Sequence, residues 1–374
     1  MKILQIYKDF YPPVVGGIEK HINLLSTNLL QRGFRIDVLV SNTNHHYSSQ
    51  RVNGINIIKA PEWGRFLSAP LNPTFPYLIY KIGLTADILH FHLPNPTAVI
   101  AYLLSTLNKP VVVTYHSDIV RQRQMSKVFT PFLEYFLKHC VYRIIATSPQ
   151  YKRNSRILYK YHEKCDIIPL GIDLDFYDKH TIPDKDIASI KIQYGPRIIL
   201  FVGKFRYYKG LNILIQAMQN VDATLLLVGN GPCSKQIRNA IKMFKLEHKI
   251  VFLNEVSDKK LAECFQVCDI FVLPSIQKSE AFGIVLLEAM TNGKPVISTD
   301  LGTGTSFINI HNETGYVVEP NNPHKLSEAI NSLFSNPNLM KKFGTNGKDR
   351  VRKYFSSDIM TDRIATLYNQ AVGR

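Results

Sequence analysis

Two carboxylates, Glu280 and Glu288, stand eight residues apart on either side of Gly283. Glu288 lies within an apolar run, which predicts a helix that begins near Gly283 and carries Glu288 a little over one turn inside. The first amides of such a helix are unpaired donors that attract phosphate. The segment therefore predicts amides for a diphosphate and two acidic acceptors for sugar hydroxyls. A buried structural helix preceded by a solvated glutamate would also fit the pattern.

A basic loop offers a second group with phosphate chemistry. One predicted strand ends at Gly203, three cations follow, and Gly210 leads into a helix. Lys204, Arg206 and Lys209 could neutralise a diphosphate leaving group. A loop that simply faces water would show the same composition.

Glycines mark two further strand-to-helix junctions. Gly16 and Gly17 follow the first predicted strand and would let the backbone approach a phosphate closely. Asn230 and Gly231 close a later strand in a tight turn that could wall a flat base with backbone donors and acceptors. Ordinary turns would explain both segments equally well.

His116 directly follows a predicted strand and is expected at the edge of a ligand cleft. A histidine at such a place is more often a hydrogen-bonded structural residue than a catalyst, and the same caution applies to His90 and His92. No metal site is expected. Cys264 and Cys268 could share a helix face, but no nearby His or Cys completes a metal set.

Short apolar runs alternate with amphipathic helical patterns along the whole chain, which predicts an α/β protein whose parallel sheets are covered by helices on both faces. The strands are expected at 2–6, 36–40, 55–58, 88–91, 111–115, 144–147 and 166–168, and then at 198–202, 224–228, 250–252, 270–273, 295–298 and 315–318.

The length of 374 residues suits two domains. We predict a first domain over 1–176 and a second over 197–355, joined by a linker at 177–196. The final segment, 356–374, is helical in pattern and is expected to pack back on the first domain. Ligands are expected at the carboxyl ends of the strands, in a cleft between the domains.

The composition is that of a globular protein, with 45% hydrophobic and 20% charged residues. No apolar run approaches the roughly 18–20 residues that span a bilayer. The first residues read as a buried strand rather than a signal peptide, and five scattered cysteines argue against a disulfide framework. A cytoplasmic protein is therefore predicted.

The net charge of +16 is concentrated between Arg121 and Lys164, where ten basic residues stand against two acids and many aromatic residues are interleaved. Such a surface suits an anionic membrane face. Nucleic acid is not expected as a partner, because no nucleic-acid-binding motif accompanies the charge. A solvated helical face whose aromatic residues point into the core would also fit.

Five segments, in order along the chain, resemble the large family of retaining nucleotide-sugar glycosyltransferases of the GT-B fold, family-four type. They are Gly16-Gly17-Ile18-Glu19, Tyr115-His116, Gly203 through Gly210, Gly229-Asn230-Gly231-Pro232, and Glu280 through Glu288. The last matches that family's E-x7-E motif, and the resemblance covers essentially the whole chain. It implies two facing Rossmann-like domains, with the nucleotide-sugar donor held mainly by the second.

The resemblance also implies roles for single residues. Lys209 and Lys204 look like the cations that bind the diphosphate. Many relatives have Arg where this chain has Lys204, and Arg206 could compensate. Glu280 resembles the carboxylate that contacts the donor sugar, and Glu288 the one that holds the nucleotide ribose.

The remaining roles concern the transferred sugar. His116 resembles the family's cleft histidine beside that sugar. The amides that meet sugar and phosphate are implied to come from Phe282, Gly283, Ile284 and Val285. Family members retain anomeric configuration and usually need no metal, so neither a metal nor another cofactor is expected. Asp173 and Asp175 match an Asp-x-Asp metal pattern only formally.

Residues 300–309 and 7–12 look like those of bacterial mannosyl- and rhamnosyltransferases that build lipopolysaccharide O-chains. This favours GDP-mannose as the donor; UDP-glucose, UDP-N-acetylglucosamine and dTDP sugars stay open. The acceptor would be a lipid-linked or growing glycan at the cytoplasmic face of the inner membrane, where the enzyme would be peripheral.

Proteins of three other classes would share some of these sequence features. A non-catalytic nucleotide-sugar-binding protein would keep the donor site without transfer. An NAD-dependent oxidoreductase would need a complete glycine fingerprint, and the one that begins at Gly302 and Gly304 has Phe307 in its third glycine position. A nucleic-acid-binding protein would show salt-dependent binding to oligonucleotides.

Overall fold

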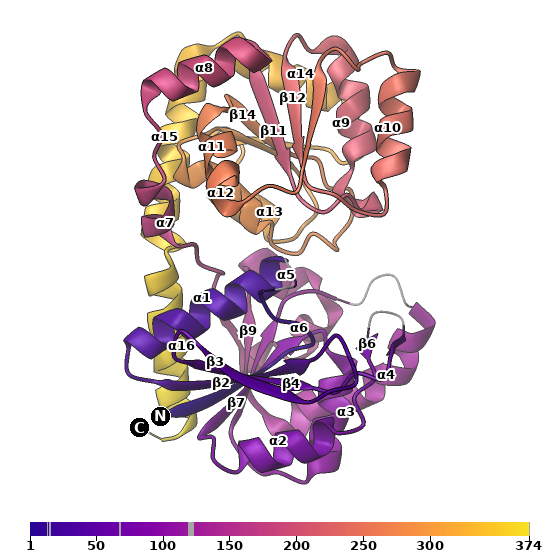
Figure 1. Ribbon diagram of the computed structural model, residues 1–374, viewed down its shortest axis with the longest axis vertical. Coiled ribbons are helices and arrows are strands. Elements are labelled where there is room, and N and C mark those ends of the chain that lie inside the picture. Colours follow the sequence, from indigo (N-terminus) through magenta and orange to yellow (C-terminus); the bar gives the residue numbers. More distant parts are fainter. Residues whose placement is uncertain (13, 15, 67–68, 119–122, 374) are drawn as a thin grey trace. The chain divides into compact units, whose positions relative to one another are not determined.

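The computed structural model describes residues 1–12, 14, 16–66, 69–118 and 123–373. Its contacts divide the chain into two compact units, one made of Met1–Gly171 with Ser357–Arg374 and the other of Ile172–Ser356 (Figure 1). The segment 177–196, for which we predicted a linker, contains α8 (Asp184–Tyr194) and the second half of α7 (Leu174–Lys179), and it is counted with the second unit.

The first unit contains an eight-stranded sheet in the order β10-β9-β8-β7-β1-β2-β4-β3. All neighbours are parallel except β3, which pairs antiparallel with β4. The strands are β1 (Lys2–Ile6), β2 (Arg35–Ser41), β3 (Ser48–Val52), β4 (Ile55–Ala60), β7 (Ile88–Leu93), β8 (Val111–Tyr115), β9 (Val141–Ala146) and β10 (Cys165–Ile167). A two-stranded ribbon, β5 (Arg65–Phe66) with β6 (Ala69–Pro70), stands beside it.

Helices cover both faces of this sheet (Figure 1). On one face, α1 (Gly17–Gln31) and α16 (Ser357–Ala371) bury Leu25, Leu29, Ile364 and Tyr368 against the strands. Arg32 fastens the end of α1 to α16 through ion pairs with Asp358 and Asp362. The other helices of this unit are α2 (Phe75–Gly83), α3 (Pro96–Ser105), α4 (Arg123–Tyr135), α5 (Pro149–Asn154) and α6 (Arg156–Lys160).

The second unit contains a six-stranded, fully parallel sheet in the order β13-β12-β11-β14-β15-β16. The strands are β11 (Ile198–Val202), β12 (Thr224–Val228), β13 (Ile250–Asn254), β14 (Ile270–Leu273), β15 (Val296–Thr299) and β16 (Gly315–Val318). This is the Rossmann order 3-2-1-4-5-6, in which the direction of winding reverses between the first and fourth strands. The reversal lies here between β11 and β14, and a ligand crevice is expected at the carboxyl ends of these two strands.

The helices of the second unit surround this sheet (Figure 1). Besides α7 and α8 they are α9 (Leu211–Ala217), α10 (Ser234–Met243), α11 (Asp258–Val267), α12 (Ile284–Thr291), α13 (Thr305–Ile308), α14 (Pro323–Phe334) and α15 (Pro337–Tyr354). Several of these helices begin at a residue whose polar side chain accepts a hydrogen bond from a backbone amide of the first turn. Ser257 does so for α11 and Asn322 for α14. Among the described residues, no helix combines the length and apolar character needed to cross a bilayer.

Every strand predicted from apolar runs is present, with small differences at the ends, so the predicted α/β class with parallel sheets is confirmed. Strand β3 was not predicted, because its residues are polar and all exposed. It is an edge strand that pairs only with β4 and has no apolar face to give a pattern.

Candidate active site

The loops that follow β11 and β14 are in contact at the winding reversal of the second sheet. Gly210 has a φ of +69°, and a Cβ there would lie 1.9 Å from the carbonyl oxygen of Pro274. The amide of Ile276 also donates to the carbonyl of Tyr208 over 2.8 Å. Only glycine allows this approach, and the approach brings the basic loop against the loop that leads to Glu280.

Lys209 and Glu280 form a buried ion pair at this contact. The Lys209 Nζ lies 2.5 Å from Oε2 of Glu280, and each residue is only 8% exposed. Ser275 donates to the same carboxylate oxygen over 3.0 Å. Both of these contacts with the carboxylate use Oε2.

Two opposing effects set the protonation state of Lys209. Burial disfavours the ammonium form, but the negative charge of Glu280 and the hydrogen bond to it, with a contribution from Tyr208, outweigh burial and raise the pKa of Lys209 above its usual range. The ammonium also lies beside Gly203, because a Cβ added there would be 3.5 Å from Nζ. The site therefore presents a fixed positive charge next to glycine backbone.

The predicted helix start is confirmed, because α12 begins at Ile284 directly after Gly283, whose φ is +82°. Two hydrogen bonds from residues outside the E-x7-E segment hold the turn that precedes α12. Thr303 donates to the carbonyl of Glu280 over 2.7 Å, and the amide of Gly304 donates to the carbonyl of Ala281 over 2.7 Å. The segment that resembled the start of a dinucleotide fingerprint thus supports the turn at Glu280.

The side chains of Phe282 and Val285 belong to the core of the second unit. Phe282 is 5% exposed and packs edge-on against Phe355, and Val285 is also buried. The predicted contribution of these two residues, and of Gly283 and Ile284, is therefore limited to backbone amides at the beginning of α12.

Glu288 has a partner that the sequence did not reveal. The phenol of Tyr177, on α7, lies close to the Glu288 carboxylate. Burial, followed by the negative charge of Glu288, raises the pKa of Tyr177 well above its usual range. Tyr177 lies at the start of the predicted linker, where no local pattern pointed to the E-x7-E segment.

The other predicted donor-binding residues occupy two loops in contact. Lys204 and Arg206 are exposed, whereas Phe205 between them is buried. The amide of Phe205 donates to the carbonyl of Asn230 over 2.9 Å, and a Cβ at Gly231 would lie 2.7 Å from the carbonyl oxygen of Phe205. The loops after β11 and β12 are therefore in direct contact. The Asn230 side chain is used within its own turn, where it accepts from the amide of Gly231.

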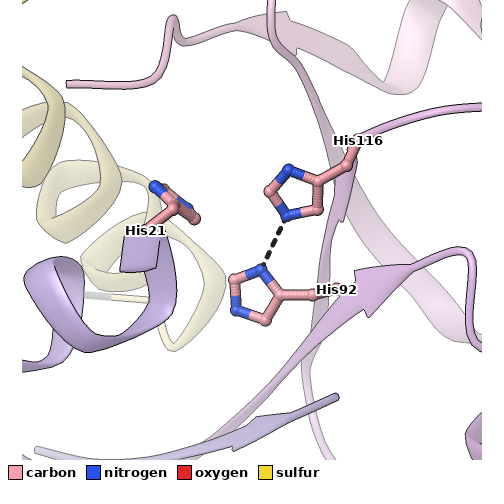
Figure 2. Close-up of side chains that lie close together, drawn as sticks. All are labelled: His21, His92 and His116. Atoms are coloured by element: carbon pink, nitrogen blue, oxygen red, sulfur yellow. Dashed lines mark hydrogen bonds between the residues drawn. The ribbon is translucent and has the colours of Figure 1, made fainter. Parts of the chain in front are cut away.

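In the first unit, His116 is part of a buried cluster with His92 and His21 (Figure 2). His116 follows β8, His92 lies near the end of β7, and His21 lies on α1. Each side chain offers one nitrogen within 4.8 Å of the others, a spacing that could hold a metal ion. In the present arrangement, however, Nδ1 of His92 and Nε2 of His116 satisfy each other over 3.0 Å.

A chain of hydrogen bonds sets the proton positions in this cluster. Gln5 donates to Ser26 over 2.9 Å, so its oxygen accepts from Nε2 of His92 over 2.9 Å. His92 is then an acceptor at Nδ1, and His116 must carry its proton on Nε2. Burial lowers the pKa of His21 to about 4 and those of His92 and His116 well below the usual value. All three side chains are therefore neutral at pH 7.

His90 has the structural role that sequence reasoning favoured. Its two ring nitrogens lie 2.6 Å from the hydroxyl of Tyr368 and 2.8 Å from that of Thr114. This joins α16 to the sheet. Nδ1 of His116, in contrast, has no hydrogen-bond partner among the described residues.

Gly16 and Gly17 stand where the sequence placed them, since Gly16 caps α1 and Gly17 is its first residue. A Cβ at Gly16 would lie 2.2 Å from a carboxylate oxygen of Glu19, so the Glu19 side chain folds back over the helix start. Pro13 and Val15 of the same predicted phosphate loop lie outside the described residues.

Comparison with known proteins identifies the family of this chain. Residues 15–176 match the family model described as Glycosyltransferase Family 4, and residues 183–350 match the model described as Glycosyl transferases group 1. D-rhamnosyltransferase WbpZ of Pseudomonas aeruginosa is 36% identical over 96% of this chain and 93% of its own length. O-antigen chain mannosyltransferase C of Escherichia coli is 34% identical over 98% of each chain.

The solved structure of sucrose-phosphate synthase from Thermosynechococcus elongatus has a TM-score of 0.83 at 23% identity, over 100% of this chain and 99% of that one. This similarity shows the fold. Together with the two sequence relatives, it confirms the family resemblance: the chain belongs to the family-four glycosyltransferases of the GT-B fold.

Proposed function

We propose that this chain is a retaining glycosyltransferase that moves a hexose from a nucleotide diphosphate sugar to a glycan. The observation that carries the proposal is the buried Lys209–Glu280 pair, which lies at the carboxyl ends of β11 and β14, beside Gly203. A lysine ammonium has three N–H donors, so Lys209 can keep its bond to Glu280 and still bind a phosphate oxygen. In this proposal the Glu280 carboxylate accepts a hydrogen bond from a sugar hydroxyl.

The proposed reaction is a front-face displacement. The bond between the anomeric carbon and the β-phosphate oxygen breaks, and its electron pair stays on the diphosphate. The acceptor hydroxyl oxygen bonds to the anomeric carbon on the same face, and its proton passes to a phosphate oxygen of the leaving group. Lys209 and the first amides of α12 stabilise the negative charge that develops there. In this scheme His116 lies beside the transferred sugar and accepts a hydrogen bond through Nδ1, and neither a metal nor another cofactor takes part.

The names of the two sequence relatives support an O-antigen-type product. One is a D-rhamnosyltransferase and the other an O-antigen chain mannosyltransferase. We therefore propose mannose as the sugar, GDP-mannose as the donor, and a lipid-linked or growing cell-surface glycan as the acceptor. UDP and dTDP sugars are the alternatives.

A thermal-shift screen against GDP-, UDP-, ADP- and dTDP-sugars tests the donor, because a ligand that binds the native state raises the melting temperature by mass action. GDP-mannose should raise it most. Transfer from GDP-mannose to a lipid-linked oligosaccharide should then yield an α-linked product, which NMR of the new anomeric proton can identify. Binding without transfer to any glycan would favour a non-catalytic nucleotide-sugar-binding protein, and a β-linked product would contradict retention.

We further propose that the first unit docks on the cytoplasmic face of the inner membrane. The predicted basic segment is divided between core and surface. Phe129, Phe136 and Tyr151 are buried, so their aromatic rings serve packing. Large apolar side chains that remain 43–66% exposed are Val128, Phe132, Tyr135, Tyr142 and Tyr159. Exposed cations of the same stretch are Lys138, Arg153, Arg156 and Lys160. Arg121 lies outside the described residues.

Liposome flotation tests this docking. The protein should float with vesicles that contain anionic lipid and stay unbound with neutral vesicles, because each basic residue near an anionic surface contributes about 1 kcal/mol. The double variant Phe132→Ser with Tyr135→Ser should reduce flotation, whereas Tyr354→Ser, an exposed aromatic residue of the second unit, should not. Equal recovery with both kinds of vesicle would reject electrostatic docking.

A further inference from the structure

Trp63 is the single tryptophan of the chain, and it is 64% exposed. It lies between β4 and β5 in the first unit. The ring of His45 packs against it, with the centroids 5.2 Å apart and the planes tilted by 42°. A tryptophan ring exposed to this extent presents a broad, flat apolar face to solvent, with a polar N–H at its rim.

The backbone around Trp63 is fixed on both sides. The amide of Trp63 donates to the carbonyl of Leu71 over 2.9 Å, and the amide of Leu71 donates to the carbonyl of Gly64 over 2.8 Å. The amide of Glu62 donates to the carbonyl of Asn44 over 2.8 Å, which joins this loop to the one that carries His45. The two rings are thus held by neighbouring loops that are hydrogen-bonded to each other.

Arg65 anchors the same loop to the sheet. Its guanidinium lies 2.8 Å from Oε1 of Glu62 and 2.6 Å from Oδ1 of Asp9, and the Asp9 side chain is only 7% exposed. Asp9 belongs to the segment that follows β1. The carboxyl ends of β1, β2 and β4 are adjacent in the sheet, so Trp63 stands at the edge where parallel α/β sheets bind ligands.

We propose that Trp63 and His45 form an aromatic platform for a hexopyranose ring of the glycan acceptor. A pyranose has a flat face of C–H groups that stacks on an aromatic ring, and a rim of hydroxyls that needs polar neighbours. Trp63 supplies the apolar face, and the exposed ring of His45, which packs against it, supplies a polar neighbour.

This inference rests on the proposed function and names the part of the first unit that would recognise the acceptor. It predicts that Trp63 contributes to acceptor affinity and not to donor binding, since the donor site is built from residues of the second unit. The interaction requires no covalent step, so binding alone can test it.

The intrinsic fluorescence of the wild-type protein reports directly on the platform, because Trp63 is the only tryptophan. Titration with α-linked mannotriose should change the emission in a saturable way. Mannitol, which has similar hydroxyls but no ring, should not change the emission. Free mannose at the same low concentration should not change it either if two or more residues of the glycan are needed to fill the site. A flat titration with mannotriose would overturn the proposal, whether or not the protein transfers sugar.

Two variants add a second readout. Trp63→Ala should raise the acceptor KM on the order of tenfold, with kcat and the affinity for GDP nearly unchanged, because a lost aromatic contact of this kind is equivalent to about one factor of ten. Trp63→Phe should restore most of the affinity. Tyr77→Ala removes a ring that is 61% exposed on α2 and serves as the matched control.

The outcomes separate the two proposals. Normal transfer with an unchanged acceptor KM in Trp63→Ala would reject the platform and leave the glycosyltransferase function intact. Saturable quenching by mannotriose without any transfer would support the platform and reject catalysis. Circular dichroism of each variant verifies that it is folded.

Discussion

The ammonium nitrogen of Lys209 lies 2.5 Å from Oε2 of Glu280, and both side chains are almost completely removed from water. The two residues belong to different loops, which meet because β11 and β14 are neighbours in the sheet. A charge pair buried at a winding reversal of an α/β sheet is costly unless both charges are satisfied. The position of the Lys209–Glu280 pair argues for a role with a charged ligand.

Replacing Lys209 with Ala should lower turnover on the order of 10²–10³-fold, because the charge that stabilises the leaving diphosphate is lost. It also leaves Glu280 without its cation, and breaking a buried pair in this way typically costs about 3–5 kcal/mol of stability. Lys209→Met keeps the apolar stem and should show the same loss of turnover. Lys242→Ala, which removes an exposed cation on α10, is the control for the loss of one positive charge. Near-normal kcat in a folded Lys209→Met would remove the leaving-group role.

Replacing Glu280 with Gln should abolish transfer while GDP binding is retained. The amide keeps the shape of the side chain and can still accept hydrogen bonds from Lys209 and Ser275, so the fold around it should persist. The negative charge next to the donor sugar is lost. Calorimetric titration with GDP and a transfer assay measure the two effects separately. Loss of both activities would indicate misfolding instead.

Replacing Gly210 with Ala should destabilise the second unit because a Cβ would meet the Pro274 carbonyl oxygen. Gly293→Ala is a matched control, since Gly293 has nearly the same positive φ but nothing within 4 Å of its added Cβ. The Gly210 variant should be less stable than the control by about 1–3 kcal/mol in urea unfolding. Equal stability of the two variants would show that the loops after β11 and β14 are not pressed together.

Stability should fall as the pH is lowered from about 6.5 to about 4, because the buried imidazole of His21 resists protonation. The pKa of His21 is about 4 in the folded chain, compared with 6.5 for a histidine that is not buried. The unfolded state therefore binds a proton first over this range, and the resulting loss for one such group is about 3 kcal/mol. His21→Gln should have a shallower dependence of unfolding free energy on pH, whereas the exposed His46→Gln should follow the wild type.

Chelation should leave transfer unchanged, because the proposed mechanism uses Lys209 and helix amides rather than a metal to stabilise the leaving group. The assay compares protein dialysed against EDTA with protein supplied with Zn²⁺ or Mg²⁺. The variant His21→Gln provides a check on the histidine cluster, whose spacing could hold a metal ion. Activity lost on chelation and restored by one metal would contradict the prediction, and loss of that response in His21→Gln would place the metal at the cluster.

Much of the fold could be read from local patterns. Apolar runs predicted the strands of both sheets, and helix caps such as Ser257 lie next to the helices that they begin. These features depend on residues close together in the chain, where periodicity and capping chemistry act. The polar strand β3 escaped prediction for the same reason, since it carries no apolar period.

The sequence by itself determined which side chains could do chemistry and that each stands where a strand ends or a helix begins. It could not determine that Lys209 pairs with Glu280, that Tyr177 lies close to Glu288, or that His45 packs on Trp63. Those partners are set by the order of the strands and by the way each loop folds over its sheet. Such contacts form between residues distant in the chain, so their free energy depends on the packing of the whole unit and leaves no local period to read.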